Sequence, residues 1–236
     1  MCTVTFIPTA KTIFITSNRD ESPSRQSKGL TSRHALQGPA IHFPLDMESN
    51  GSWIAFTDHG RAVCLLNGGF VPFIPSPSYR MSRGQVVIDA ASNDDLHAFT
   101  ENYNLEGIAP FTLLIFEKNT FVELVWDGFK RHIKPLPTDV PQIWSSVTLY
   151  SPEIRAWRKE LFVQWLSERE KFDRESIMAF HCMKKGDSIN DFIMNRNEVV
   201  KTLSVTSIQL QKHKGSILHL DLENNTREEV LISYDE

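Results

Sequence analysis

The alternation of β-hairpins with helical segments is the feature of this sequence that most restricts its fold. Short runs rich in β-branched and aromatic residues predict three hairpins, with strands at 3–7 and 12–16, 52–57 and 62–67, and 111–117 and 121–127. Apolar residues at helical spacing predict helices within 82–103, 152–169 and 173–185, before a terminal β-meander over 204–232. Several strand runs are apolar on both faces, so each sheet must be covered on both sides. Two packed sheets with helices outside them satisfy this order in one domain over residues 1–236.

Composition and cysteine spacing exclude several classes of protein. Hydrophobic residues make up 41% of the chain and charged residues 23%, with a net charge of −4, as in ordinary soluble globular proteins. The chain has no basic run that would indicate a nucleic-acid partner, and no stretch approaches the about 18 apolar residues of a membrane span. Its first residues lack the features of a signal peptide, so we expect a cytoplasmic location. Three widely spaced cysteines indicate neither zinc nor a disulfide framework; we expect no metal and no cofactor, and the oligomeric state is left open.

Two segments are expected at the surface. The polar stretch 22–33, rich in Ser and Arg, indicates a loop. The helix at 152–169 is expected to pack one apolar stripe on the core, made of Ile154, Trp157, Leu161 and Trp165. Its basic residues, with those just after it, are expected to form a solvated face, made of Arg155, Arg158, Lys159, Arg169 and Lys171.

The first predicted hairpin places polar residues beside the start of the chain. A turn centred at residues 9–10 pairs Cys2 with Ser17 across the two strands. The residues that then emerge beside the chain terminus are Asn18, Arg19 and Asp20. This juxtaposition brings a thiol, a guanidinium and a carboxylate to one end of the hairpin.

A cysteine at position two becomes N-terminal when Met1 is removed. Its free α-amine, whose pKa in an unperturbed peptide is about 7.7–8.0, can then act as a base for the thiol of the same residue. A neighbouring Arg19 would lower the thiol pKa, and a neighbouring Asp20 would orient the amine. The alternative interpretation is a chance cysteine followed by an ordinary polar turn.

Cys2, together with the Asn-Arg-Asp-Glu run at 18–21 after a hairpin, resembles the signature of the NRDE family, also called the transport and Golgi organisation protein 2 family. Further similarity lies at 52–67, 82–84, 110–116 and 151–159. The resemblance implies an α+β fold, a four-layer αββα sandwich of two mainly antiparallel sheets flanked by helices, of the N-terminal-nucleophile hydrolase type. It also implies kinship with choloylglycine hydrolases and penicillin acylases, which cleave linear amides.

The resemblance assigns roles to four residues of this chain. It implies Cys2 as the nucleophile, with Arg19 and Asp20 beside it, and Asn67 as the oxyanion-hole residue. Asn67 precedes two glycines at a predicted strand end, where a side-chain amide and backbone N–H groups could face an oxyanion together. A turn residue in the left-handed conformation is the alternative for Asn67.

The sequence departs from the family pattern at two places. Where the family has an Asn before its helix, this chain has Ser146, a candidate replacement donor. Where the family has an Arg in its last meander, this chain has Leu203, and Lys201 lies two residues earlier as a candidate substitute cation. Asn18 and Trp53 complete the candidate binding residues. Trp53 and the aromatic stretch 70–73 could line an apolar acyl pocket or could be ordinary core and loop anchors.

Two functions from different classes follow. The first is a cysteine-dependent amidohydrolase or acyltransferase that acts on a small-molecule linear non-peptide amide or acyl substrate. The second is a non-catalytic binding or carrier protein for an apolar acyl, lipid or haem-like ligand on the same fold, which the two departures favour.

Overall fold

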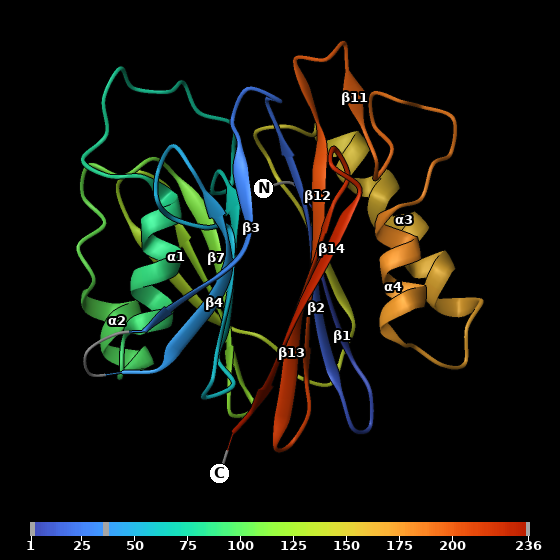
Figure 1. Ribbon diagram of the computed structural model, residues 1–236. Coiled ribbons are helices and arrows are strands. Elements are labelled where there is room, and N and C mark those ends of the chain that lie inside the picture. The colour runs from blue at the N-terminus through green and yellow to red at the C-terminus, as the bar shows by residue number, and fades with distance from the viewer. Residues whose placement is uncertain (1–2, 35–37, 235–236) are drawn as a thin grey trace.

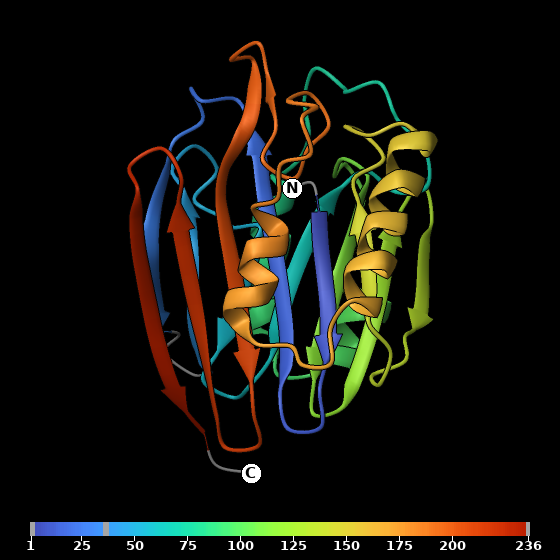
Figure 2. The same ribbon diagram turned by 90° about the vertical axis from the view of Figure 1, so that its right-hand side faces the viewer.

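The computed structural model describes residues 3–34 and 38–234, which form four layers (Figure 1). Two sheets pack face to face, with α1 and α2 on the outer face of one and α3 and α4 on the outer face of the other. Figure 2, turned by 90°, shows α3 and α4 lying across the sheet that holds the first strand. The predicted αββα architecture is therefore confirmed.

The first sheet, here called sheet A, combines strands from both ends of the chain. Its order is β10-β1-β2-β12-β13-β14, and β11 pairs with β12. All the pairings are antiparallel. The strands are β1 (Thr3–Pro8), β2 (Ile13–Glu21), β10 (Gln142–Ser145), β11 (Asn195–Arg196), β12 (Val200–Leu210), β13 (Lys214–Asp221) and β14 (Thr226–Ser233).

The second sheet, sheet B, is an antiparallel meander in chain order from β3 to β9. Its strands are β3 (Ser27–His34), β4 (Ala40–Asp46), β5 (Ile54–Thr57), β6 (Ala62–Asn67), β7 (Phe111–Glu117), β8 (Thr120–Trp126) and β9 (Arg131–Pro135).

The central strands are apolar on both faces because each face meets a different layer. On β6, Cys64 lies in the core between the sheets, whereas its neighbours Val63 and Leu65 pack in the cluster that includes Val86 and Val87 of α1. Alternate residues of a strand point to opposite faces, so a buried middle layer needs hydrophobic residues at every position.

The four helices of the described residues begin at local capping signals. Ser82, Asp95, Ser151 and Asp173 each accept a backbone N–H of the first turn, and Pro152 takes the position after its cap. The helices are α1 (Arg83–Ser92), α2 (Leu96–Asn102), α3 (Pro152–Ser167) and α4 (Arg174–His181). α1 and α2 both lie within the predicted helical region 82–103, whereas α4 ends several residues before the predicted 185.

Two expectations about the first strands are wrong. The β1–β2 hairpin pairs Thr3 with Asn18, so its register is shifted by two residues from the predicted one. The shift of two keeps every side chain on its predicted face. The stretch 22–33 is not all loop, since β3 begins at Ser27; it is an edge strand with few buried side chains, which is why its composition resembles that of a loop.

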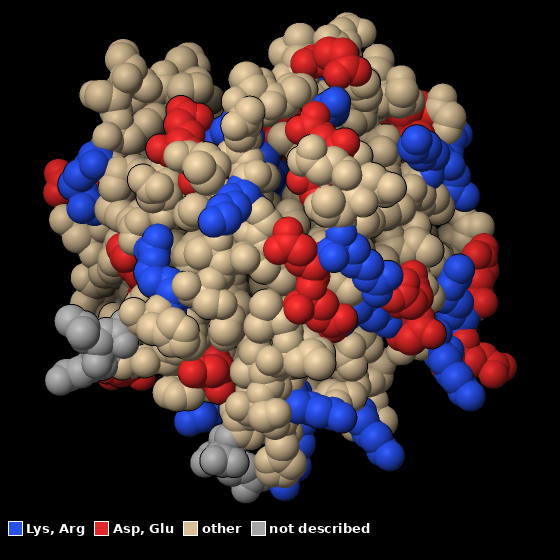
Figure 3. Space-filling model, viewed as in Figure 1, with Lys and Arg blue, Asp and Glu red and all other residues tan. Residues whose placement is uncertain are grey.

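The buried face of α3 also differs from the predicted stripe. Its buried residues are Arg158, Phe162 and Trp165, whereas Trp157 and Leu161 are half-buried. Arg158, expected on a solvated basic face, has no exposed surface. On the face shown in Figure 3, acidic and basic side chains are interspersed. None of the helices in the described part of the chain is long and apolar enough to cross a membrane.

Candidate active site

Alternation along β2 sends the predicted site residues to opposite faces of sheet A. Arg19 faces the space between the sheets, where its guanidinium carbon lies 4.6 Å from the centre of the Trp53 ring. Asn18 and Asp20 face the helical layer, where they contact His181 and Tyr150 respectively. Cys2 lies outside the described residues.

Asp20 is buried and held by two hydroxyl groups. Tyr150 Oη donates to Asp20 Oδ2 at 2.6 Å, and Thr202 Oγ1 donates to Asp20 Oδ1 at 2.6 Å. Thr202 stands opposite Asp20 in the β2–β12 pairing, next to a register shift that accommodates Leu203. The two donors fix the orientation of the carboxylate at the end of β2.

Arg158 lies behind this group and was not predicted as part of it. Its guanidinium donates to Thr3 Oγ1 and to the carbonyl oxygens of Asn190 and Asp191. It also stacks on Tyr150, with its guanidinium carbon 3.8 Å from the ring centre. A buried cation from α3 therefore ties the first described residue of β1 to the tyrosine that holds Asp20.

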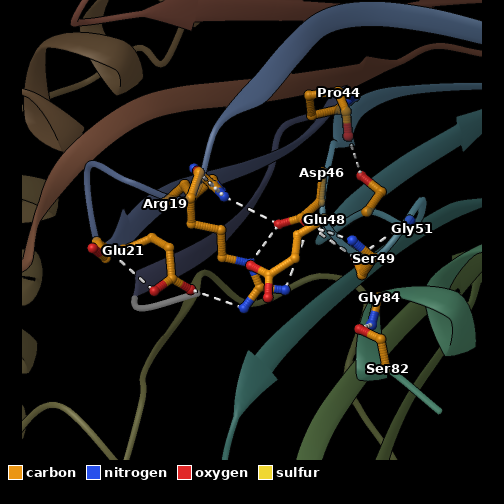
Figure 4. Close-up of polar contacts among 12 residues, drawn as sticks. Arg19, Glu21, Pro44, Asp46, Glu48, Ser49, Gly51, Ser82 and Gly84 are labelled. Atoms are coloured by element: carbon orange, nitrogen blue, oxygen red, sulfur yellow. Dashed lines mark hydrogen bonds and ion pairs between the residues drawn. The ribbon is translucent and has the colours of Figure 1, made fainter.

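Arg19 is anchored by an aspartate that sequence analysis also missed. Arg19 Nη2 donates to Asp46 Oδ2 at 3.1 Å and to the Arg25 carbonyl at 2.9 Å. Asp46 also accepts from Arg25 Nε at 2.9 Å and from the Ser49 backbone N–H at 3.0 Å (Figure 4). Burial raises the pKa of Asp46, but the Ser49 N–H and Arg25 outweigh it and leave the pKa below its ordinary value. Burial lowers the pKa of Arg19 despite the nearby Asp46.

Asn18 links β2 to the end of α4 and to the segment that contains Phe192, and it is not among the residues that line the two cavities described below. Its amide nitrogen donates to the carbonyl oxygens of His181 and Phe192 at 2.9 and 3.0 Å. Its amide oxygen therefore faces His181 Nδ1, which must carry the proton of that hydrogen bond. Thr5 Oγ1 lies 2.7 Å from the other ring nitrogen. Burial, assisted by the charge of Arg158, lowers the pKa of His181 to about 3.

The buried histidines predict a stability that falls in mild acid. Burial also lowers the pKa of His219 to about 4. Below a pH of about 6.5, the pKa of an unfolded histidine, these two histidines bind protons in the unfolded chain but not in the folded chain. The stability of the fold therefore drops as pH falls. Each of these histidines adds about 1.4 kcal/mol per pH unit to the slope between pH 6 and pH 4.5.

Urea unfolding at several pH values measures this slope. His181→Gln should flatten it by the contribution of one histidine, whereas His59→Gln should leave it unchanged, because the His59 side chain is 64% exposed. An unaltered slope in His181→Gln would show that His181 titrates normally.

Two cavities meet at Asn67. The large cavity, of about 350 Å³, is lined by residues of both sheets and of the start of α1, including Arg19, Trp53, Leu65, Asn67, Phe73 and Arg83. The small cavity, of about 170 Å³, is lined by Gly68, Gly69, Phe70, Trp144 and Ser146 as well as Asn67. The structure thus brings Arg19, Trp53 and Asn67 into one cavity and places Ser146 on the other side of Asn67.

Asn67 ends β6 opposite Phe111. The left-handed conformation, with φ of 87°, belongs to Gly68, and Asn67 does not adopt it. A Cβ on Gly68 would lie 2.5 Å from Val147 Cγ2, so only glycine fits there. Ser146 Oγ donates to the Asn67 carbonyl at 2.8 Å, which directs its proton at the backbone.

The remaining candidates lie away from the cavities. Lys201 is ion-paired with Glu223 at 3.0 Å and with Glu198 at 3.3 Å, and it is not among the lining residues of the large cavity. Cys64 is buried, and burial raises the pKa of its thiol to about 12. Burial also raises the pKa of Cys182.

The four-layer sandwich of this protein is the fold of the N-terminal-nucleophile hydrolases. The N-acylethanolamine-hydrolyzing acid amidase ortholog of Caenorhabditis elegans superposes with a TM-score of 0.58 at 14% identity, over 88% of this chain and 92% of that one. Two variants of the conjugated bile acid hydrolase from Clostridium perfringens give TM-scores of 0.55 and 0.51 at 11% and 10% identity, over 100% and 99% of this chain and 97% of each of theirs.

The chain belongs to the Transport and Golgi organisation 2 family, whose sequence profile matches residues 1–132. The matched region contains β1, β2 and nearly all of sheet B, and so includes Arg19, Asp20 and Asn67. A comparison with curated protein sequences finds no match.

Proposed function

We propose that this protein is a cysteine-dependent N-terminal-nucleophile amidase or acyltransferase that acts on a linear non-peptide amide, with Cys2 as the nucleophile after removal of Met1. The observation that carries the proposal is the meeting of Arg19 and Asn67, from different sheets, in one cavity, with Asp20 fixed beside Arg19 on β2. The likeness to amide hydrolases in fold adds support.

In this proposal the α-amine of Cys2 takes the thiol proton as the sulfur attacks the substrate carbonyl. The Asn67 side-chain amide stabilises the oxyanion that forms, and the charge of Arg19 favours the thiolate. Asp20 orients the protonated amine, which gives its proton to the leaving nitrogen as the C–N bond breaks. Water, or a second amine in a transferase, then attacks the thioester and releases the thiol.

A panel of N-acyl amides and lactams, incubated with the wild type and with Cys2→Ala, tests the proposal. We expect release of amine by the wild type, none by Cys2→Ala, and unchanged release by Cys182→Ser, which alters a half-buried thiol outside the site. Intact mass should show that Met1 is absent from the active protein. Equal turnover by Cys2→Ala, or turnover by a preparation that retains Met1, would refute the mechanism.

The carrier function is the second candidate, and one contact favours it. Because Ser146 directs its hydroxyl proton at the Asn67 carbonyl, it does not supply the second side-chain donor that the missing Asn would provide. A carrier would bind acyl ligands with equal affinity in the wild type and in Cys2→Ala and would release no amine in the same panel.

A further inference from the structure

Residues 68–82, which connect β6 to α1, form a long loop without regular structure that stands out beyond α1 (Figure 1). The part from 68 to 79 contains no charged residue, and the upper left of Figure 3, where this loop lies, shows neither acidic nor basic side chains at its tip. Phe70, Val71 and Ile74 are more than half exposed, and Ile74 is 94% exposed. Large apolar side chains exposed so close together mark an interaction surface.

The β8–β9 turn, which lies beside this loop, carries another exposed aromatic side chain. Phe129 is 90% exposed, and its backbone N–H donates to Asp127 Oδ1 at 2.8 Å. Asp127 Oδ2 lies 2.7 Å from His132 Nε2, and the His132 ring centre lies 4.9 Å from that of Phe70. Two apolar tips from different parts of the chain therefore lie next to each other.

The loop is anchored on its inner side. Phe73 and Tyr79 line the large cavity, and the Ser76 backbone N–H donates to Tyr79 Oη at 2.8 Å. Prolines at 72, 75 and 77 fix the φ angle at three further positions. Val71 and Ile74 are not among the residues that line the cavity. The loop therefore has an inner side that forms part of the cavity wall and an outer side that is apolar and exposed.

The size and shape of this surface fit a lipid bilayer better than a protein partner. An aromatic side chain buries about 200 Å². Two phenylalanines, a valine and an isoleucine, each partly covered already, therefore offer less than the about 800 Å² that each partner of a stable complex buries. A bilayer needs no matching shape, because apolar side chains that enter its interface bind in proportion to the area they bury.

We infer that the tips formed by residues 70–74 and by Phe129 dock the protein on the surface of a lipid bilayer, where their apolar side chains enter the boundary between headgroups and acyl chains. Because Phe73 and Tyr79 of the same loop line the large cavity, docking places one wall of that cavity at the bilayer surface. The inference goes beyond the proposed function and does not depend on it, since docking requires neither Cys2 nor turnover.

Flotation of the full-length protein with vesicles of phosphatidylcholine and phosphatidylserine tests the inference. We expect the wild type to float with the vesicles. Ile74→Ser should weaken partitioning about tenfold, and Ile74→Ser combined with Phe129→Ser about a hundredfold, because burying one such side chain contributes at least a factor of about ten. Leu231→Ser is the matched control: it removes an exposed leucine of β14 and should float like the wild type.

A tryptophan placed at the second tip locates the contact. The emission added by Phe129→Trp should be quenched by vesicles with brominated acyl chains, because tryptophan at a docked tip lies at the membrane interface. The emission added by Leu231→Trp should not be quenched. Circular dichroism checks that each variant is folded, which the exposure of the substituted side chains favours.

Failure of the wild type to float, unchanged partitioning of the double variant, or equal quenching at positions 129 and 231 would overturn the inference. Self-association that the double variant loses, without vesicle binding by the wild type, would identify a second copy of the chain as the occupant and would equally overturn it. Vesicle binding without amide turnover would support docking and contradict the enzymatic proposal alone. Turnover without vesicle binding would contradict docking alone.

Discussion

Replacing Arg158 with alanine should lower the free energy of unfolding by about 3–5 kcal/mol, as large truncations in a core do. The guanidinium is fully buried and donates to Thr3 and to the carbonyls of Asn190 and Asp191. Its loss leaves those acceptors without donors and opens a cavity between Tyr150 and Phe192, on whose rings it stacks. Urea unfolding followed by circular dichroism measures the change.

Lys159→Ala is the matched control, because it removes the next residue of α3, which is exposed. It should change stability by no more than about 0.5 kcal/mol. Arg158→Lys keeps the charge but not the planar fork, so it should also be clearly destabilised. A variant Arg158→Ala as stable as the wild type would mean that the buried guanidinium contributes no net stability.

Asp46→Ala should have an effect of similar size, about 3–5 kcal/mol at neutral pH. The substitution removes the carboxylate that accepts from Arg19, Arg25 and the Ser49 backbone, and leaves the Arg19 charge buried without its counterion. Glu48→Ala serves as control, because Glu48 contacts Arg25 at 3.6 Å with a side chain that is 73% exposed. The control should change stability by less than about 1 kcal/mol.

The pH dependence of the stability that Asp46 contributes gives a second measurement. The pKa of Asp46 is lower in the folded state than its ordinary value, so the carboxylate stabilises the fold above the unfolded pKa of about 3.9. That contribution is lost as pH falls through the lower folded pKa. The difference in unfolding free energy between the wild type and Asp46→Asn should therefore be constant from pH 6 to pH 8 and shrink below about pH 4. A difference that persists unchanged at pH 2 would contradict this.

The layered fold was predictable because hydrophobic patterning determines it. Runs such as 62–67 and 111–117 are apolar at nearly every position, which only a sheet covered on both sides can accommodate. The strand β3 escaped prediction because most of its side chains face solvent at the sheet edge, and its pairing with β4 leaves no periodic signal.

The site was predictable only in part. Arg19 and Asp20 were identified by the predicted hairpin and by the family resemblance, and Asn67 was identified by the resemblance. The structure brings Arg19 and Asn67 into one cavity. Asp46 was missed because its contact with Arg19 joins two different sheets. Its position three residues before Ser49 is typical of an aspartate that accepts a backbone N–H in a turn, and this spacing could have identified it as a structured carboxylate. Arg158 was misplaced because charge favours exposure, and only its stacking on two aromatic rings reveals why it is buried.

The two sheets differ in how far apart in sequence their paired strands lie, and this difference affects the order in which they can fold. Sheet B pairs strands that follow one another directly, whereas Asp20 and its donor Thr202 are 182 positions apart. Pairings at such separation close long loops and form slowly. During synthesis the meander of sheet B can therefore assemble early, while the β2–β12 pairing must wait for nearly the whole chain. The polar group around Asp20 is thus completed only after β12 has been made, so its formation reports that the chain has folded at least as far as that strand.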